Sequence, residues 1–330
     1  MRRSNNSKLN RCAVRLYGAL GIAMLPILSA AAVQVAYVAN QGNGTLSLID
    51  TASDQVLRTL PATGSLGKKI QAAVADRAGK TVFVVDAAAD ALVAVDLANA
   101  DRAPRSIKVG KSPEGASMSP SGKTVAVCVE DDNVVALVDV ATERVTRKIH
   151  TQGKNPEHCV FSGDEKWLLA SDENSDDVDI IDLKAHRSIA KVHTAGGPRG
   201  IAWLPNGSAA YVAQERGGGV DVIDIAKRAV VKSIHTGLRP ADVIGSVDGS
   251  RVFVSNGGDG TVSVIDTASA TVVATVPVGK RPWNMALTQD GKKLYVANGR
   301  SGSVSVIDTE ALKVVKEVPV GELPWGVNIP

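Results

Sequence analysis

Aromatic side chains make up only 3% of this chain, and its 330 residues include only three cysteines. It has no Gly-x-Ser-x-Gly elbow, no His-Glu-x-x-His helix, no phosphate-binding loop and no Cys-x-x-Cys pair. These absences argue against the usual serine-hydrolase, zinc-protease and P-loop motifs, and against a thiol-redox pair or a c-type haem attachment. A helix-period stretch is also missing beyond the N-terminus. What is present, 44% hydrophobic residues and 31 glycines, suits short Val/Ala/Ile strands joined by tight turns.

Residues 1–32 have the composition of an export signal. Five basic residues precede an apolar run from Leu16 to Leu28, and the small residues of Ser29–Ala32 follow it. We interpret the segment as a signal peptide cleaved near Ala31 or Ala32, which predicts a periplasmic protein. The alternative is an uncleaved anchor, but about 13 apolar residues are too few to span a bilayer. Its removal changes the formal net charge from +3 to −2, so the precursor's basic pI gives no support for nucleic-acid binding.

The rest of the chain repeats one pattern, an apolar run, a polar Gly/Asn turn and a Val-x-Val-Ile-Asp ending, as in Leu294–Thr309. The closing aspartate recurs at intervals of 46, 43, 43, 42, 42 and 42 residues, at Asp50, Asp96, Asp139, Asp182, Asp224, Asp266 and Asp308. A period near 40 with several short strands per unit is typical of a β-propeller. We therefore predict an all-β, seven-bladed propeller of four-stranded blades over residues 33–330.

The last complete unit shows how each blade should be built. Its turns predict strands over residues 283–288, 293–297, 303–307 and 314–320. The mature chain starts in a second strand, Val35–Ala39, and ends with an extra first strand, Trp325–Ile329. One composite blade should therefore close the ring, with its inner strand from the C-terminus and its other three from the N-terminus. Residues 64–79 depart from the repeat because Gly64–Gly67 lacks the proline of the other entry turns.

The repeats carry a family resemblance. Tyr37–Asn40 followed by Leu48–Thr51, with its counterparts at Phe253–Thr267 and Tyr295–Thr309, resembles the YVTN β-propeller repeat over the whole mature chain. The plan also resembles the seven-repeat periplasmic propellers associated with pyrroloquinoline-quinone (PQQ)-dependent alcohol catabolism. That resemblance implies, as partner, a periplasmic dehydrogenase, its cytochrome or a transporter component.

The repeat register places two cysteines near each other. Cys128 should lie on a second strand and Cys159 on the first strand of the next blade. A disulfide between the blades is conceivable on this geometry. The interpretation we prefer is two buried thiols that act as small hydrophobes.

Function should reside where the seven copies disagree. In a four-stranded blade, the loop that enters the first strand and the loop between strands two and three share a face. We predict that a partner or ligand binds there, at the mouth of the central channel. The candidate binding residues are Glu114, Glu157, His158, Arg199, Asp242, Trp283, Asn284 and Trp325.

Other interpretations of this face remain open. Glu157 and His158, with Glu114, Asp172 or Glu173 nearby, are suitable metal ligands, but adjacent strand residues point to opposite faces and no ligand spacing is evident. The two tryptophans form either a stacking platform or a wedge between the final blades. A small anionic ligand is possible because cations recur in the entry loops, at Lys68, Lys69, Lys111, Lys154, Arg199, Arg239, Lys280 and Arg281. The recurrent His150, His193 and His235 lie too far out on the blades to form a site.

The main prediction is a monomeric, non-catalytic periplasmic binding propeller without a metal or cofactor, accessory to a PQQ-dependent dehydrogenase or a linked transport system. The alternative is a metal-dependent propeller enzyme, of lactonase or lyase type, with its site at the channel mouth. Metal content and turnover distinguish the two.

Overall fold

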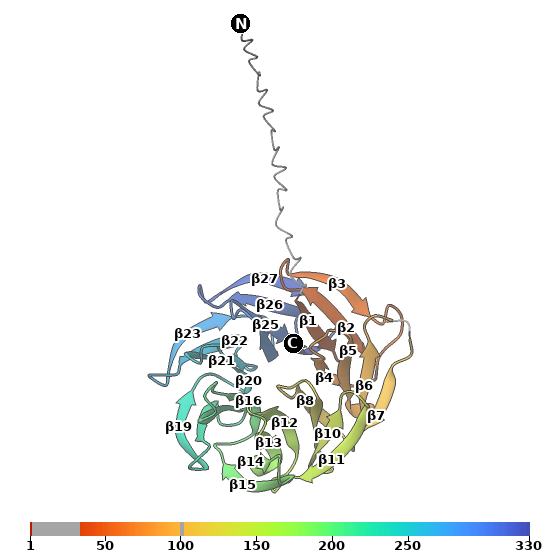
Figure 1. Cartoon of the computed structure of the whole chain (residues 1–330). Helices are drawn as coiled ribbons and strands as arrows, with labels where there is room; N and C mark the ends of the chain where they lie inside the picture. The colour runs from red at the N-terminus through yellow and green to blue at the C-terminus, as the bar shows by residue number, and fades with distance from the viewer. Residues whose placement is uncertain (2–33, 100–101) are drawn as a thin grey trace. The chain divides into compact units, whose positions relative to one another are not determined.

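Seven four-stranded antiparallel sheets surround a centre in the computed structural model, which describes Met1 and residues 34–99 and 102–330 (Figure 1). The predicted signal segment lies outside the described residues. Among those that are described, no helix is long and apolar enough to cross a bilayer. The seven-bladed, all-β prediction is confirmed.

We number the blades along the chain. Blade 1 consists of β28 (Pro324–Asn328), β1 (Val35–Asn40), β2 (Thr45–Asp50) and β3 (Gln55–Leu60), and blade 2 of β4 (Ile70–Ala75), β5 (Thr81–Asp86), β6 (Ala91–Asp96) and β7 (Arg105–Lys108). Blade 3 comprises β8 (Pro113–Met118), β9 (Thr124–Val129), β10 (Val134–Asp139) and β11 (Arg144–His150). Blade 4 comprises β12 (Pro156–Phe161), β13 (Trp167–Asp172), β14 (Asp177–Asp182) and β15 (Arg187–His193).

The remaining three blades follow the same order from the inside outwards. Blade 5 comprises β16 (Pro198–Trp203), β17 (Ala209–Gln214), β18 (Gly219–Asp224) and β19 (Ala229–His235). Blade 6 comprises β20 (Pro240–Gly245), β21 (Arg251–Asn256), β22 (Thr261–Asp266) and β23 (Thr271–Pro277). Blade 7 comprises β24 (Pro282–Leu287), β25 (Lys293–Asn298), β26 (Ser303–Asp308) and β27 (Lys313–Pro319). Single 3₁₀ turns follow β5 and β13, at Ala87–Ala89 and Glu173–Ser175.

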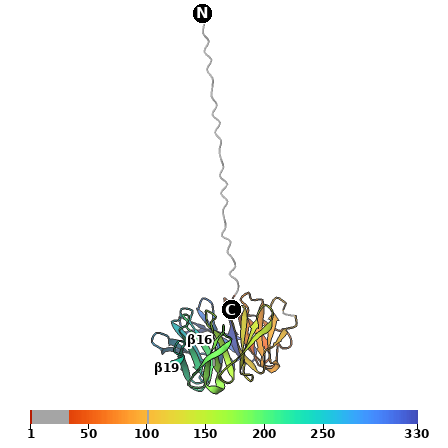
Figure 2. The ribbon, with the colours of Figure 1, turned by 60° about the horizontal axis from the view of Figure 1, so that its bottom comes forward.

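The ring closes through blade 1 as the sequence predicts. Strand β28 pairs antiparallel with β1, and Val38 lies opposite Val327. This pairing covers the inner edge of the N-terminal three strands, which an open array would leave unpaired. Figure 2 shows the blades packed side by side around the ring.

Burial of both faces of the middle strands holds the blades together. Phe83, Tyr295 and Phe253 are at most 1% exposed, and each packs in an apolar cluster. Sandwiched sheets require side chains that are apolar on both faces, which explains why these strands lack a polar alternation. Cys128 and Cys159 lie together in one such cluster and are free thiols.

The asparagine that closes the second strand in the repeat motif has a structural role. In blade 1 the Asn40 amide donates to Thr45 Oγ1 at 3.0 Å and to Ser47 Oγ at 2.9 Å. Asn256 and Asn298 make the equivalent bonds in blades 6 and 7. A buried amide needs such partners, and the repeat supplies them from the third strand.

Blade 4 breaks this rule, since Asp172, Asp177 and Asp179 occupy the three equivalent positions. Asp179 accepts from the backbone N–H groups of Gln152 and Gly153, at 2.6 and 3.1 Å. Burial, and then the Asp179 carboxylate, raises the pKa of Asp172 to about 9. Asp172 therefore carries a proton at neutral pH.

Candidate functional site

The entry loops and the loops between strands two and three meet on one face of the ring. In each blade, the first residue after the second strand donates its N–H to a carbonyl of the entry loop; examples are Glu215 to Gly197 at 2.8 Å and Gly257 to Arg239 at 2.8 Å. The shared face that the sequence analysis assumed is therefore present.

Each inner strand begins with a backbone irregularity that aims side chains into the channel. The register between β12 and β13 shifts between Pro156 and His158, and β20 shifts likewise between Pro240 and Asp242. Ser171 Oγ accepts from the displaced N–H of His158 at 3.1 Å, and Ser255 does the same for Asp242 at 3.0 Å. Bulges of this kind re-aim side chains next to functional sites.

Small residues alternate with large ones around this ring of inner strands. A side chain at Gly200 would collide with Asp242, and one at Gly115 with the Glu157 carbonyl. At Gly326 a Cβ would approach the Cβ of Asn284 to 2.9 Å. The channel therefore has room for His158, Asp242 and Asn284 because the neighbouring blades contribute glycine.

The side chain of His158, on β12 of blade 4, contacts residues of blades 7 and 1. Its ring stacks on Trp325 with the centroids 5.8 Å apart and the planes 12° from parallel. The Asn284 amide donates to Nε2 at 3.2 Å, which assigns the imidazole proton to Nδ1. No described residue accepts from Nδ1. Burial, and then the charge of Arg199, lowers the pKa of His158 to about 4, so the ring is neutral at pH 7.

Arg199 on β16 joins the acids of three blades. Its guanidinium pairs with Glu157, with Glu114 at 3.5 Å and with Glu215 at 2.7 Å. Burial raises the pKa of Glu157 well above its usual range; the Arg199 charge opposes this shift and Glu114 reinforces it. Burial and Glu114 thus favour the protonated form of Glu157, and Arg199 opposes them.

A second pair of carboxyls extends this acidic side. Burial, and then Glu114, raises the pKa of Glu130 to about 8. Ser112 Oγ donates to Glu130 at 3.0 Å. For Glu114 itself burial acts upward, but Arg199 and hydrogen bonds from Glu157 and Glu130 hold its pKa below normal. The pair thus shares a proton, with Glu114 the ionised partner.

Glu215 is the centre of a basic group on the other side of Arg199. Arg239 and Arg281 donate to its Oε1 at 2.5 to 3.0 Å, while Arg199 binds Oε2. Against the effect of burial, Arg199 and the hydrogen bonds from Arg281 and Arg239 lower the pKa of Glu215 to about 2. The single carboxylate of Glu215 therefore accepts hydrogen bonds from three guanidinium groups.

Asp242 adds a carboxylate poised near neutrality. It is 6% exposed, and its Oδ2 accepts from the backbone N–H of Met285 at 2.8 Å. Burial raises the pKa of Asp242 to about 7, against the effect of backbone hydrogen bonds from Met285 and Val243. A group with this pKa suits general acid–base chemistry at physiological pH.

The predicted site residues are brought together in part. Glu114, Glu157 and Arg199 form one cluster, and His158, Asn284 and Trp325 form another. Trp325 is 4% exposed and packs with residues of blades 2 and 3, so no open platform is formed there. Trp283 lies under Arg281, whose Cζ is 5.9 Å from its ring centroid.

The structure also bears on the metal site and the ring of cations that the sequence analysis considered. Glu157 and His158 have separate partners, and no group of three His, Cys, Asp or Glu side chains among the described residues is arranged to hold a metal. The entry-loop cations gather at Glu215 as Arg199, Arg239 and Arg281, whereas Lys68, Lys111 and Lys154 are exposed on other blades. The charges form a one-sided cluster rather than a ring.

Glu215, Glu130 and Arg300 belong to this face but were not among the predicted site residues. A signal for Glu130 and Glu215 exists in the position directly after the second strand, which is Glu130, Glu173 and Glu215 in blades 3 to 5 and Gly257 and Gly299 in blades 6 and 7. The acids and the glycines are separated into different halves of the ring.

With this geometry established, comparisons with known proteins become informative. Residues 158–321 match the family model described as lactonase, 7-bladed beta-propeller. The matched range contains His158, Arg199, Glu215, Asp242 and Arg281. No curated protein sequence matches the chain.

Similar solved structures share the fold. A putative 6-phosphogluconolactonase from Bacteroides uniformis ATCC 8492 is 18% identical, with a TM-score of 0.72 over 90% of this chain and 99% of that one. Hydrazine synthase of Kuenenia stuttgartiensis is 23% identical, with a TM-score of 0.69 over 78% of this chain and 88% of that one. Dihydro-heme d1 dehydrogenase NirN is 16% identical, with a TM-score of 0.66 over 92% and 76%, respectively. The family match favours the enzyme alternative over the binding module.

Proposed function

We propose that the chain is an enzyme of lactonase type, which opens the ring of a lactone by water attack at the channel mouth. The observation that carries the proposal is the meeting, at Arg199, of a buried acidic cluster and the arginine cluster of Glu215, beside the poised carboxyl of Asp242. The lactonase family match over residues 158–321 supports the same reaction class.

The residues supply the three functions that lactone hydrolysis needs. Asp242 is the general base that takes a proton from the attacking water. The arginines hold the negative charge that develops on the carbonyl oxygen, since fixed cations in a site with little water stabilise such charge strongly. Glu157 returns a proton to the departing ring oxygen as the C–O bond breaks. Burial raises the pKa of both carboxyls, to about 7 for Asp242 and well above the usual range for Glu157, which suits a base and an acid respectively.

His158 has a positioning role in this scheme. The imidazole is neutral, and Asn284 and Trp325 fix its orientation. Its Nδ1–H is a buried donor without a described partner, which suits a hydrogen bond to a substrate oxygen. The metal of the sequence-based alternative is not part of the proposal, because the donor groups present do not fit a metal.

The test is an assay of ring opening with a panel of γ- and δ-lactones, some neutral and some bearing a carboxylate or phosphate. The release of acid measures the rate. Asp242→Asn keeps the acceptor for the Met285 N–H and should lower the rate at least about 100-fold. Asp131→Asn, on an exposed loop of the same face, is the matched control and should retain the wild-type rate. A folded wild-type protein that opens none of these lactones would return the chain to the binding-module interpretation.

A further inference from the structure

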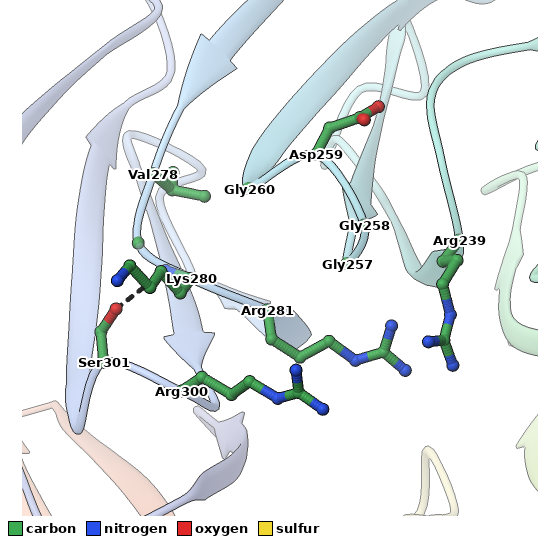
Figure 3. Close-up of a pocket in the computed structure, with 11 residues that line it drawn as sticks. Arg239, Gly257, Gly258, Asp259, Gly260, Val278, Lys280, Arg281, Arg300 and Ser301 are labelled. Atoms are coloured by element: carbon green, nitrogen blue, oxygen red, sulfur yellow. Dashed lines mark hydrogen bonds between the residues drawn. The ribbon is translucent and has the colours of Figure 1, made fainter.

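A pocket of about 700 Å³ lies between the loops of blades 6 and 7, next to the Glu215 cluster. Its wall is formed by Arg239, Gly257–Gly260, Val278–Arg281, Arg300 and Ser301. Figure 3 shows the guanidinium groups of Arg239, Arg281 and Arg300 converging on one space, while Lys280 and Asp259 point elsewhere.

The charge in this space is not balanced by the described protein groups. Glu215 is shared among three arginines, and Asp259, the acid of the pocket wall, accepts instead from the backbone N–H of Leu238 at 2.6 Å. The side chain of Arg281 is 11% exposed, and no described residue accepts a hydrogen bond from its Nη1. Arg300 forms no salt bridge with any described residue. Arg281 is thus a largely buried guanidinium with an unpaired donor, and the exposed Arg239 and Arg300 add positive charge beside it, an arrangement that favours an anion.

The fold does not itself call for arginine at these positions. Arg239 and Arg281 precede the entry-turn proline with φ of 54° each, in the left-handed region. Asn155 and Gly197 fill the same position in blades 4 and 5, and these residue types tolerate that conformation better. Ser112 and Leu323 have the same conformation in blades 3 and 1, with φ of 52° and 48°, so the turn accepts several residue types and does not itself require arginine.

Glycine keeps the space in front of the guanidinium groups open. A Cβ at Gly257 would come within 2.9 Å of Arg281 Nη1. The backbone N–H groups of Gly257, Gly258 and Gly260 already donate to loop carbonyls, so recognition falls to the side chains. Planar guanidinium forks match the paired oxygens of phosphate and carboxylate groups.

We infer that this pocket binds the anionic group of the substrate, a phosphate or a carboxylate, through Arg281 and Arg300 with Arg239 at its edge. That the anion belongs to a lactone rests on the proposed function. The pocket holds the anionic end of the substrate. Arg281 belongs both to the pocket wall and to the Glu215 cluster, so the rest of the substrate extends from it towards Arg199 and Asp242. Substrates with a negative charge several bonds away from the lactone carbonyl are therefore preferred over neutral lactones.

Anion binding can be measured without turnover. Calorimetric titration of the full chain with inorganic phosphate, and separately with malonate, should detect one site per chain, and the stronger of the two identifies the anion. Arg300→Gln should weaken that binding about tenfold, because one charge-assisted pair is lost. Arg147→Gln, on the exposed outer strand of blade 3, is the matched control and should bind as the wild type does.

The outcomes separate the two proposals. If lactone turnover is found but neither anion binds, or if Arg300→Gln binds as well as Arg147→Gln, the anion subsite is wrong. If phosphate or malonate binds through Arg300 while no lactone is opened, the subsite stands and the lactonase proposal fails. If both hold, Arg300→Gln should raise KM for an anionic lactone about tenfold with kcat within about twofold.

Discussion

The two halves of the channel mouth, built from the same repeat, differ in charge. In blades 3 and 4 the variable positions are acids, namely Glu114, Glu130, Glu157 and Glu173. In blades 6 and 7 they are Arg239, Arg281 and Arg300 beside Gly257 and Gly299. Blade 5 joins the halves, since Arg199 faces the acids and Glu215 faces the arginines.

The halves also differ in how they balance buried charge. The acidic half does so internally, through Arg199 and through protons retained on Glu130 and Glu157. The basic half cannot do the same, because a guanidinium does not lose its proton at physiological pH. In our inference an external anion completes the balance, in the pocket beside blades 6 and 7.

Replacement of Arg199, which joins the acidic and basic halves, should have the largest effect on stability. Arg199→Met leaves Glu114 and Glu215 without their shared cation, and we expect the free energy of unfolding to fall by about 3–5 kcal/mol at pH 7. Urea denaturation measures it. Arg147→Met should change stability by less than about 0.5 kcal/mol, and equal effects for the two variants would contradict the junction.

The second prediction concerns the protonation of Asp172 in blade 4. Its pKa of about 9 in the folded protein lies above the unfolded value, so its contribution to stability is full at low pH and is lost as pH rises through about 9. Asp172→Asn, the residue of blades 1, 6 and 7, does not titrate. We expect the variant to gain about 5 kcal/mol over the wild type between pH 5 and pH 9, at about 1.4 kcal/mol per pH unit. Parallel stability curves in thermal unfolding would show that Asp172 is not protonated.

Gly257→Glu would transplant the acid of blade 5 into blade 6. The new carboxylate should pair with Arg281 and Arg239 and fill the pocket, which lowers phosphate or malonate affinity at least about tenfold. Gly257→Ala is the matched control, with a smaller loss because it only narrows the pocket. Calorimetry on both variants decides the point, and unchanged affinity in Gly257→Glu would mean that the anion binds elsewhere.

The repeat made the scaffold predictable from sequence. The spacing of Asp50, Asp266 and Asp308 determines blade number, and the surplus strand Trp325–Ile329 predicts the composite blade, which β28 and β1 confirm. Such features depend on local turns and on burial, both of which the sequence displays directly.

The site was only partly predictable because its contacts join distant residues. Arg281 binds Glu215 across 66 positions, and Asn284 reaches His158 across 126. The one-residue shifts after Pro156 and Pro240 decide which side chains enter the channel, and the strict strand alternation assumed in the sequence analysis does not predict them. Export, the PQQ association and a protein partner remain predictions from the sequence.

The most direct test of the account is the pH dependence of kcat/KM for lactone opening in the wild type and in Asp242→Asn. Since the base acts in its ionised form and its pKa is about 7, wild-type kcat/KM should rise about tenfold per pH unit below 7 and level off above it. Asp242→Asn should lose this rise together with at least about 99% of the rate. A variant that keeps the wild-type profile, or a wild type without lactone turnover at any pH, would contradict the account.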